Sequence, residues 1–344
     1  MAKKQPRVRP LLVRPGSRYT CFGDGLCCTD IHGLGPLTKK ELVQIRKIDP
    51  DGAAWDEGFE ARMLNTAPDG GCHFLLPDAH CEIHARYGPG AKPEGCRRFP
   101  LGLVATPAGG RITTEHRCPC RTLGDRPLLT EEAALPSLRG PNGKPRADRE
   151  VVKIKLAKKV KVSFDDWRTL EAELLEKLAG GCPPEEVLAA DPFPRLKHSS
   201  WEDEAETILE EAPDGTAFGF AALWFAETIR GLVVDGHRVR VPLRPWAAAF
   251  DRAEQRPAES ANSADDVFAD WIADEIWALK WYERPFDRAR ADLATRLAIA
   301  RDIAWRLEAE HGVALARAAA EAVMVVELIG ESDFWTEIAE LIRV

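Results

Sequence analysis

The cysteines are the residues of this chain whose type and spacing point most directly to chemistry. Eight of the nine lie between positions 21 and 120, whereas Cys182 stands alone in the second half of the chain. The eight are Cys21, Cys27, Cys28, Cys72, Cys81, Cys96, Cys118 and Cys120. Thiolates are soft ligands that suit either tetrahedral zinc or an iron–sulfur cluster. We therefore predict that these eight residues are the ligands of a metal-binding module.

The spacing of the cysteines leaves the kind of metal open. The first group reads Cys21-Phe-Gly-Asp24-Gly-Leu-Cys27-Cys28, and the glycines beside Asp24 allow the backbone to curl tightly around a ligand. Adjacent cysteines tend to point apart, and a disulfide between them would be strained. Cys27 and Cys28 are therefore expected to serve two neighbouring sites or two corners of a polynuclear cluster. The sequence contains neither a regular zinc-ribbon pair nor a ferredoxin run.

In their order, the cysteine segments resemble the YkgJ-like cysteine-cluster family, which is described as zinc- or iron-chelating. That family opens with C-x-x-C-x-x-C-C, and Cys21, Cys27 and Cys28 match the pattern. The later family segments are matched by Cys72-His-Phe-Leu, Cys81-Glu-Ile, Cys96-Arg-Arg-Phe-Pro100 and Cys118-Pro119. The resemblance covers about residues 19 to 125. The resemblance implies zinc or iron as the metal, and with the thiolate chemistry we expect either an iron–sulfur cluster, of the 4Fe-4S type, or zinc as the cofactor.

One position departs from the family pattern. Asp24 stands where the family has its second cysteine. A carboxylate is a harder ligand than a thiolate, so direct ligation by Asp24 would alter the charge of the centre. Cys120, two residues beyond the matched Cys118, restores the number of thiols to eight. Either Asp24 or Cys120 is therefore a candidate replacement.

A second resemblance concerns the segment Cys81-Glu-Ile-His-Ala-Arg-Tyr-Gly, followed by Pro93 and Cys96-Arg. It is similar to flagellin lysine-N-methylase, in which such a cysteine module precedes a largely helical region. This resemblance implies S-adenosylmethionine as methyl donor and a protein lysine as acceptor. The sequence has no glycine-rich strand-to-helix loop of the usual methyl-donor kind. No catalytic residue is therefore assigned.

Other residue types in the chain are expected to have mainly structural roles. The histidines of the module are expected to lie at the surface or behind the ligands rather than to bind metal; they are His32, His73, His80, His84 and His116. Cys182 is expected to be a small buried residue. Six tryptophans are expected to pack in the core, namely Trp224, Trp246, Trp271, Trp277, Trp281 and Trp305.

Composition limits the classes of partner. The chain has 344 residues and a net charge of -8, which argues against a broad nucleic-acid surface. No apolar stretch has the length of a signal peptide core or a membrane span, so we predict a cytoplasmic protein without a membrane partner. In a reducing compartment, clustered cysteines more often bind metal than form disulfides. The basic segment from Lys3 to Arg18 is expected to be a mostly solvated arm.

The predicted fold class is mainly α, with an irregular cysteine-rich metal-binding module and a short hairpin, followed by an all-helical domain. We divide the chain into a basic arm (1–20), the cysteine module (21–125), a Pro/Gly-rich linker (126–150) and the helical domain (151–344). The hairpin is expected from Leu101–Thr106 and Arg111–Glu115 around Pro-Ala-Gly-Gly. The alternating segment from Val151 to Val162 fits either a strand or a polar-faced helix.

Capping signals and apolar spacing predict the helices. Thr38-Lys-Lys-Glu41 and Ser163-Phe-Asp-Asp166 each open one, and Ser200-Trp-Glu-Asp203 opens another. Further helices are expected over about 217–234, 264–282, 286–310, 313–329 and 333–342. Within 286–310, the core-facing residues are expected to be Leu293, Leu297, Ala300, Ala304 and Leu307.

Three functional hypotheses remain from the sequence. The first is a metal or iron–sulfur protein whose functional centre is the cysteine module. The second is a protein lysine methylase that holds a protein substrate between the module and the helices. The third is a non-catalytic interaction protein in which zinc stabilises the fold.

Overall fold

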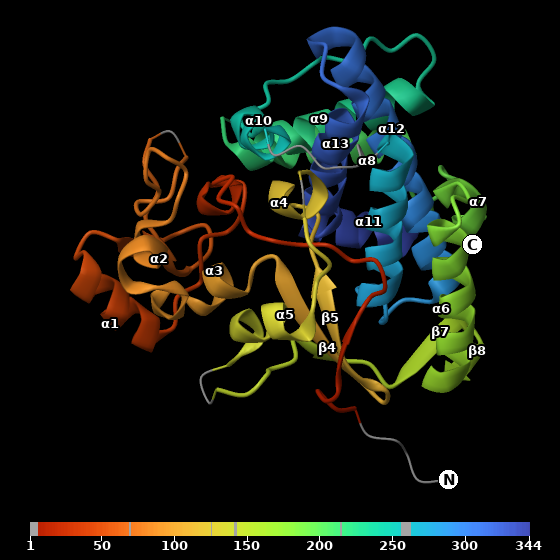
Figure 1. Ribbon diagram of the computed structural model, residues 1–344. Coiled ribbons are helices and arrows are strands. Elements are labelled where there is room, and N and C mark those ends of the chain that lie inside the picture. Colours follow the sequence, from red (N-terminus) through yellow and green to blue (C-terminus); the bar gives the residue numbers. More distant parts are fainter. Residues whose placement is uncertain (1–5, 69, 125, 141–142, 214, 256–262) are drawn as a thin grey trace.

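A computed structural model describes residues 6–68, 70–124, 126–140, 143–213, 215–255 and 263–344. Short elements on one side of a small sheet carry most of the cysteines, and long helices lie on its other side (Figure 1). Helix is the dominant element in this described part of the chain. The described part of the chain thus combines many helices with small sheets, which agrees in part with the predicted fold class.

The cysteine-bearing part begins with η1 (Leu26–Cys28) and α1 (Lys39–Ile48). The N-cap Thr38 and Glu41 form the predicted capping box at the start of α1. The remaining short elements are the antiparallel pair β2 (Ala53–Asp56) and β3 (Ala61–Leu64), α2 (Glu82–Tyr87), η2 (Pro89–Ala91) and α3 (Glu94–Arg98). Loops join them, as an irregular module would require.

A four-stranded mixed sheet joins this part to the helices. β4 (Leu101–Thr106) and β5 (Gly109–Thr114) form the predicted hairpin, and the strand order is β1-β5-β4-β6. β1 (Leu11–Val13) runs parallel to β5, and β6 (Arg149–Glu150) runs parallel to β4. Between β5 and β6 lie α4 (Pro119–Thr122) and α5 (Glu131–Leu138). The segment expected to be a linker thus contains α5 and β6.

The start of the described chain is not a solvated arm. Residues of β1 pair with β5, and the Arg14 side chain is 8% exposed. Its guanidinium forms ion pairs with Asp270 and Asp274 on α11 (Ala264–Ala278). The expectation of a mostly solvated basic arm is therefore wrong for residues 6–18, because this segment pairs with the sheet and with acidic residues of the same chain. Residues 1–5 lie outside the described residues.

The second half begins with a hairpin, β7 (Lys153–Ala157) and β8 (Val160–Ser163), which shows that the segment left undecided forms strands. The expectation of an all-helical domain is wrong in this respect. The helices that follow are α6 (Phe164–Ala179), α7 (Pro184–Leu188), α8 (Trp201–Glu211), α9 (Ala217–Val233), α10 (Ala247–Glu254), α11, α12 (Phe286–His311), α13 (Leu315–Gly330) and α14 (Asp333–Leu341). Capping boxes at Ser163 and Ser200 open α6 and α8 as predicted.

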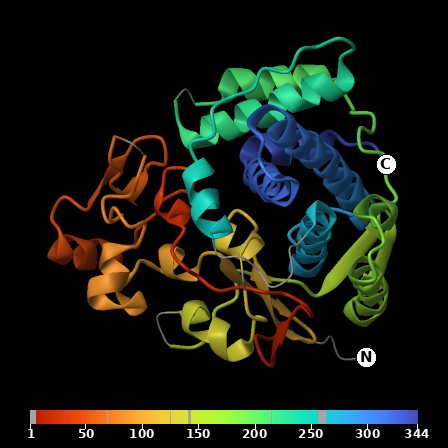
Figure 2. The same ribbon diagram turned by 45° about the horizontal axis from the view of Figure 1, so that its top comes forward.

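The main hydrophobic core lies among these helices and reaches into the cysteine-bearing part. The predicted core face of α12 is buried throughout. Phe22, Cys118 and Cys120 belong to the same core, whereas Cys28 and Cys72 belong to a smaller one with Phe74. Figure 2 shows α10 beside the loop that precedes η1. The helices therefore help to position one group of cysteines directly.

Five of the six tryptophans expected in the core are buried, but Trp305 is not. Its exposed fraction is 58%, and the guanidinium of Arg306 lies 5.7 Å from the centre of its ring. Trp305 follows the buried residue Ala304 on α12 and faces solvent, because neighbouring positions on a helix point about 100° apart.

Candidate metal centre

The structure sorts the eight cysteines into two neighbouring groups. The group that we call the Cys120 cluster consists of Cys21, Asp24, Cys118 and Cys120. The group that we call the Cys28 cluster consists of Cys27, Cys28, Cys72, Cys81 and Cys96. None of the eight is in a disulfide. The adjacent Cys27 and Cys28 lie near the boundary between the groups.

In the Cys120 cluster, a carboxylate and thiols converge in a buried position. Ligand atoms of Asp24, Cys118 and Cys120 all lie within 4.8 Å of one another. The Cys120 thiol donates to Asp24 Oδ2 at 2.6 Å, and the Cys120 backbone N–H donates to the same oxygen at 3.2 Å. A hydrogen bond between the Cys21 and Cys120 thiols raises the pKa of Cys21. This arrangement is able to hold a metal ion.

The loop before η1 has a fixed shape that points Asp24 at Cys120. Asp24 Oδ1 accepts a hydrogen bond from the Leu26 backbone N–H at 2.8 Å. Arg252 of α10 donates from Nε to the Asp24 carbonyl oxygen at 2.7 Å. Gly25 has φ 84°, and a Cβ there would lie 2.9 Å from Cβ of Ala79. The glycine therefore allows this loop to lie directly against the loop that precedes Cys81.

In the Cys28 cluster, four cysteines line one small cavity. Cys28, Cys72, Cys81 and Cys96 line a space of about 10 Å³, together with Lys92 and apolar side chains. A volume of roughly 10–15 Å³ holds one water-sized particle. The cavity is therefore no larger than the space that one water molecule needs.

Local backbone structure brings these thiols together from separate segments. The Cys72 backbone N–H donates to the Cys28 carbonyl oxygen at 2.7 Å. Cys81 is the N-cap residue of α2, and Cys96 lies in α3. The sulfur of Cys27 lies 4.0 Å from that of Cys28.

Electrostatics distinguishes the thiols of the Cys28 cluster, because the pKa is lowered at Cys81 and raised at Cys28, Cys72 and Cys96. The hydrogen bond from Cys28 lowers the pKa of Cys81, as do backbone N–H groups at the start of α2. Hydrogen bonds to Cys27 and Cys81 correspondingly raise the pKa of Cys28. Burial opposes the charge of Lys92, but the surrounding sulfurs outweigh it and raise the Lys92 pKa. A half-buried ammonium group is thus available to offset thiolate charge.

Other thiols in this cluster are neutral at pH 7 when no cation is present. Burial raises the pKa of Cys72 to about 11 and that of Cys96 to about 12. Metal ligation requires the thiolate form, so binding would release protons from these residues.

The donor sets of both clusters fit soft-metal coordination. Cysteine thiolates suit soft metals, but among the described residues only Asp24, Cys118 and Cys120 have ligand atoms that all lie within 4.8 Å of one another. The sequence presented Asp24 and Cys120 as alternatives. The structure instead places both residues in the same cluster, where they contact each other.

The remaining candidates from the sequence lie outside the two clusters. His116 contacts Asp274 at 3.0 Å, His73 contacts Asp49 at 2.9 Å, and the buried His32 ring packs against Phe99 with the ring centres 4.6 Å apart. The other two module histidines, His80 and His84, are exposed.

Cys182 is not the buried residue that the sequence led us to expect. It is half-buried rather than fully buried, and its thiol lies 3.7 Å from a carboxylate oxygen of Glu186. The pair Pro183-Pro184 starts the short helix α7 here, which leaves the preceding cysteine near the surface.

Sequence reasoning missed a buried ionic network beside the Cys120 cluster. Asp270 and Asp274 of α11 form ion pairs with Arg14 and Arg121, and Arg121 directly follows Cys120. The side chains of Arg121 and Asp274 are 0% and 5% exposed. The two aspartates are four residues apart on a helix and therefore lie on the same face. This spacing was the sequence signal from which a shared cationic partner could have been predicted.

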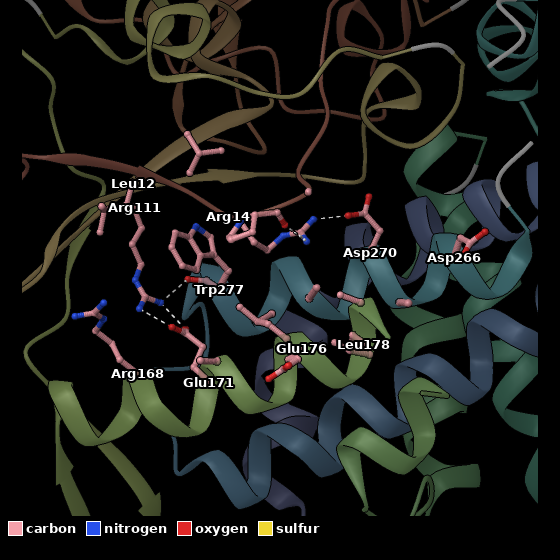
Figure 3. Close-up of a pocket in the computed structure, with 18 of the residues that line it drawn as sticks. Leu12, Arg14, Arg111, Arg168, Glu171, Glu176, Leu178, Asp266, Asp270 and Trp277 are labelled. Atoms are coloured by element: carbon pink, nitrogen blue, oxygen red, sulfur yellow. Dashed lines mark hydrogen bonds and ion pairs between the residues drawn. The ribbon is translucent and has the colours of Figure 1, made fainter. Parts of the chain in front are cut away.

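Part of this network borders a groove of about 790 Å³ between β1, α6 and α11. Figure 3 shows Arg14 directed at Asp270 on one side and Arg111 directed at Glu171 and Trp277 on the other. Most of the lining between these pairs is aliphatic. The groove contains none of the cysteines, so it is separate from the candidate metal centre.

Across the described residues, no helix is both long and apolar enough to cross a membrane. Comparison of the chain with protein-family models, with curated proteins and with solved structures found no match.

Proposed function

We propose that this protein is a metal-binding protein that coordinates metal through thiolates at both cysteine clusters. The observation that carries the proposal is the convergence of Asp24, Cys118 and Cys120, whose ligand atoms lie within 4.8 Å of one another in a buried position. These residues come from segments almost 100 positions apart, and the Asp24 carboxylate also accepts a hydrogen bond from the Cys120 backbone N–H. The four-thiol cavity of the Cys28 cluster supports the same function.

The geometry also bears on the kind of metal. A zinc–sulfur bond of about 2.3 Å in a tetrahedral site places two thiolates roughly 3.8 Å apart. The 4.0 Å between the Cys27 and Cys28 sulfurs and the small four-thiol cavity are compatible with single ions. An iron–sulfur cluster distributes its thiolates over several irons, and among the described residues no three sulfurs of the Cys28 cluster all lie within 4.8 Å of one another. Single ions and an iron–sulfur cluster are therefore both candidates, and the experiment below distinguishes them.

The structural consequence of bound metal would differ between the clusters. The Cys28 cluster has only a small hydrophobic core around it, so metal there would supply part of the folding free energy of the module. The Cys120 cluster is part of the main core and also contacts α10 through Arg252. Metal there would connect the cysteine-bearing part to the helices. Lysine methylation with S-adenosylmethionine remains a prediction from resemblance alone.

The test is anaerobic purification of the full chain, followed by metal analysis, acid-labile sulfide analysis and an optical spectrum. We expect about two equivalents of zinc without sulfide if both clusters hold single ions. Iron with sulfide and broad visible absorption would establish a cluster instead. A folded protein that binds neither zinc nor iron under these conditions would refute the proposal.

Two serine variants separate the clusters. Cys72→Ser removes a thiol from the four-thiol cavity, and Cys118→Ser removes one from the Cys120 cluster. Each is expected to lose the metal of its own cluster and to retain that of the other. Cys182→Ser is the matched control, since this thiol lies outside both clusters, and its metal content should equal that of the wild type.

A further inference from the structure

A groove of about 620 Å³ lies between the β7–β8 hairpin, the start of α12 and the end of α14. Figure 1 shows this hairpin on the side of the molecule that faces away from the cysteine-bearing part. Six cationic side chains line the groove, against three carboxylates. The six are Lys155, Lys158, Lys161, Lys197, Arg284 and Arg288. We call it the lysine groove, and its excess of positive charge contrasts with the net charge of -8 of the whole chain.

The hairpin places like charges directly opposite each other. Lys155 of β7 and Lys161 of β8 are cross-strand partners, so their side chains share one face of the hairpin, and Lys153 lies on the same face. The alternate residue Ile154 is fully buried on the other face. Residues 151–163 contain no carboxylate that could lie between the lysines. Opposed like charges destabilise a strand pair, so the stability of the hairpin does not account for this arrangement.

Two of the lysines reach between the walls of the lysine groove. Lys155 Nζ donates to the carbonyl oxygen of Glu283 at 3.3 Å, and Lys197 Nζ donates to the carbonyl oxygen of Glu340 at 2.5 Å. A backbone carbonyl oxygen orients an ammonium group but does not neutralise its charge. None of the four lysines in the lining forms an ion pair with a residue that the structure describes. Their positive charge is therefore available to a partner.

The two arginines of the lysine groove already have anionic partners. Arg284 lies 3.3 Å from Asp292, and Arg288 lies 2.9 Å from Glu340. The other two carboxylates of the lining accept hydrogen bonds from uncharged groups next to them. Four lysines thus accompany two carboxylates that no cation in the described part of the chain neutralises. The charge that remains after this pairing is positive and belongs to the lysines.

We propose that the lysine groove binds an acidic segment of a partner protein, whose aspartate or glutamate side chains pair with Lys155, Lys158 and Lys161. Separate carboxylates on a peptide can avoid Glu283 and Asp287, whereas a continuous row of phosphates would be repelled by them. No aromatic side chain lines the groove, so the bases of a single-stranded nucleic acid would have no surface on which to stack. This surface is independent of the metal proposed above.

The test is a fluorescence anisotropy titration of a labelled oligoglutamate peptide with the full-length, metal-replete protein at low and at physiological salt. We expect saturable binding that weakens as the salt concentration rises, because exposed ion pairs are screened. A labelled oligothymidylate and vesicles that contain phosphatidylserine are titrated in parallel. Absence of saturable peptide binding would overturn the proposal, and so would tighter binding of the oligonucleotide or the vesicles than of the peptide.

A double variant locates the binding. Lys155→Gln with Lys161→Gln removes the opposed charges, and the loss of two exposed ion pairs predicts about fivefold weaker binding. This variant should fold, because it removes a repulsion between the strands. Lys39→Gln with Lys40→Gln is the matched control: it makes the same change in net charge at two exposed positions of α1, and it should bind as the wild type does. Equal weakening in both double variants would mean that binding follows net charge alone, which would contradict a site in the lysine groove.

Discussion

The thiol of Cys120 donates a hydrogen bond to the carboxylate of Asp24 at 2.6 Å, although 96 positions separate the two residues. This contact joins the loop before η1 to the short helix α4. Asp24 therefore belongs to the cluster, although it stands where the family pattern has a cysteine.

The first prediction concerns Asp24. Asp24→Asn removes the negative charge of the side chain but preserves its shape. We expect the affinity of the Cys120 cluster for metal to fall at least tenfold, because an amide is a weaker ligand than a carboxylate. Asp24→Cys, which introduces a thiol at this position, should retain metal. The measurement is metal content after dialysis. Asp78→Asn, in an exposed loop, is the control and should keep its full content.

Metal removal is predicted to affect the Cys28 cluster more than the helices. The hydrophobic core around the Cys28 cluster is small, whereas α9 and α11–α13 share the large main hydrophobic core. After chelation, hydrogen exchange should accelerate in residues 70–98 and stay slow in α12 and α13. Uniform acceleration across both parts would contradict this prediction, because it would mean that the whole chain depends on the metal.

The buried pair of Arg121 and Asp274 is predicted to contribute strongly to stability. Asp274→Asn leaves the buried Arg14 and Arg121 with less negative charge, and breaking a buried ion pair costs about 3–5 kcal/mol. The control is Asp265→Asn, which removes an exposed partner of Arg301 and should cost less than about 1 kcal/mol. Urea denaturation at pH 7 measures both free energies of unfolding. Equal effects would show that burial of the network contributes nothing.

The same variant has a predicted pH dependence. Arg121 and Arg14 hold the pKa of Asp274 well below its usual value, against the effect of burial. The folded state therefore binds fewer protons than the unfolded state as the pH falls below about 4, and the stabilisation is progressively lost. The difference between the wild type and Asp274→Asn should accordingly be full at pH 6 and smaller at pH 3. A difference that grows toward low pH would reverse the assigned sign.

His32 is predicted to destabilise the protein in mild acid. Burial lowers its pKa to about 3, and the positive charge of Arg117 acts in the same direction, whereas Glu331 opposes it. Between about pH 6.5 and pH 3 the unfolded state binds a proton that the folded state does not, so the free energy of unfolding decreases by up to about 1.4 kcal/mol for each pH unit of acidification. His32→Phe should weaken this dependence and preserve the contact with Phe99. His84→Phe, at an exposed position, is the control and should leave the pH profile unchanged.

Two tryptophans test the assignment of the core. Trp335 is fully buried and stacks on Trp201, so Trp335→Ala should cost about 3–5 kcal/mol. Trp305→Ala should change the free energy of unfolding by less than about 0.5 kcal/mol, because most of its side chain is exposed. Denaturation of the two variants under identical conditions checks both values.

Local signals in the sequence determined the helices and most of the candidate ligands. Capping boxes at Thr38, Ser163 and Ser200 mark helix starts because the side chain and the backbone N–H that it satisfies lie within one turn. The eight cysteines were identifiable by residue type alone. Whether Val151 to Val162 formed a strand or a helix was open, since a short alternating segment suits both.

Only the tertiary structure decided which residues share a site. It divided the thiols into two clusters, placed Asp24 against Cys120 and paired Arg14 with two aspartates about 260 positions away. It also placed Lys155 opposite Lys161 beside one groove. Such contacts depend on how the strands and helices pack, and nothing in the spacing of the residues encodes that packing locally. The chemistry of each residue is therefore evident from the sequence, whereas its partner depends on the fold.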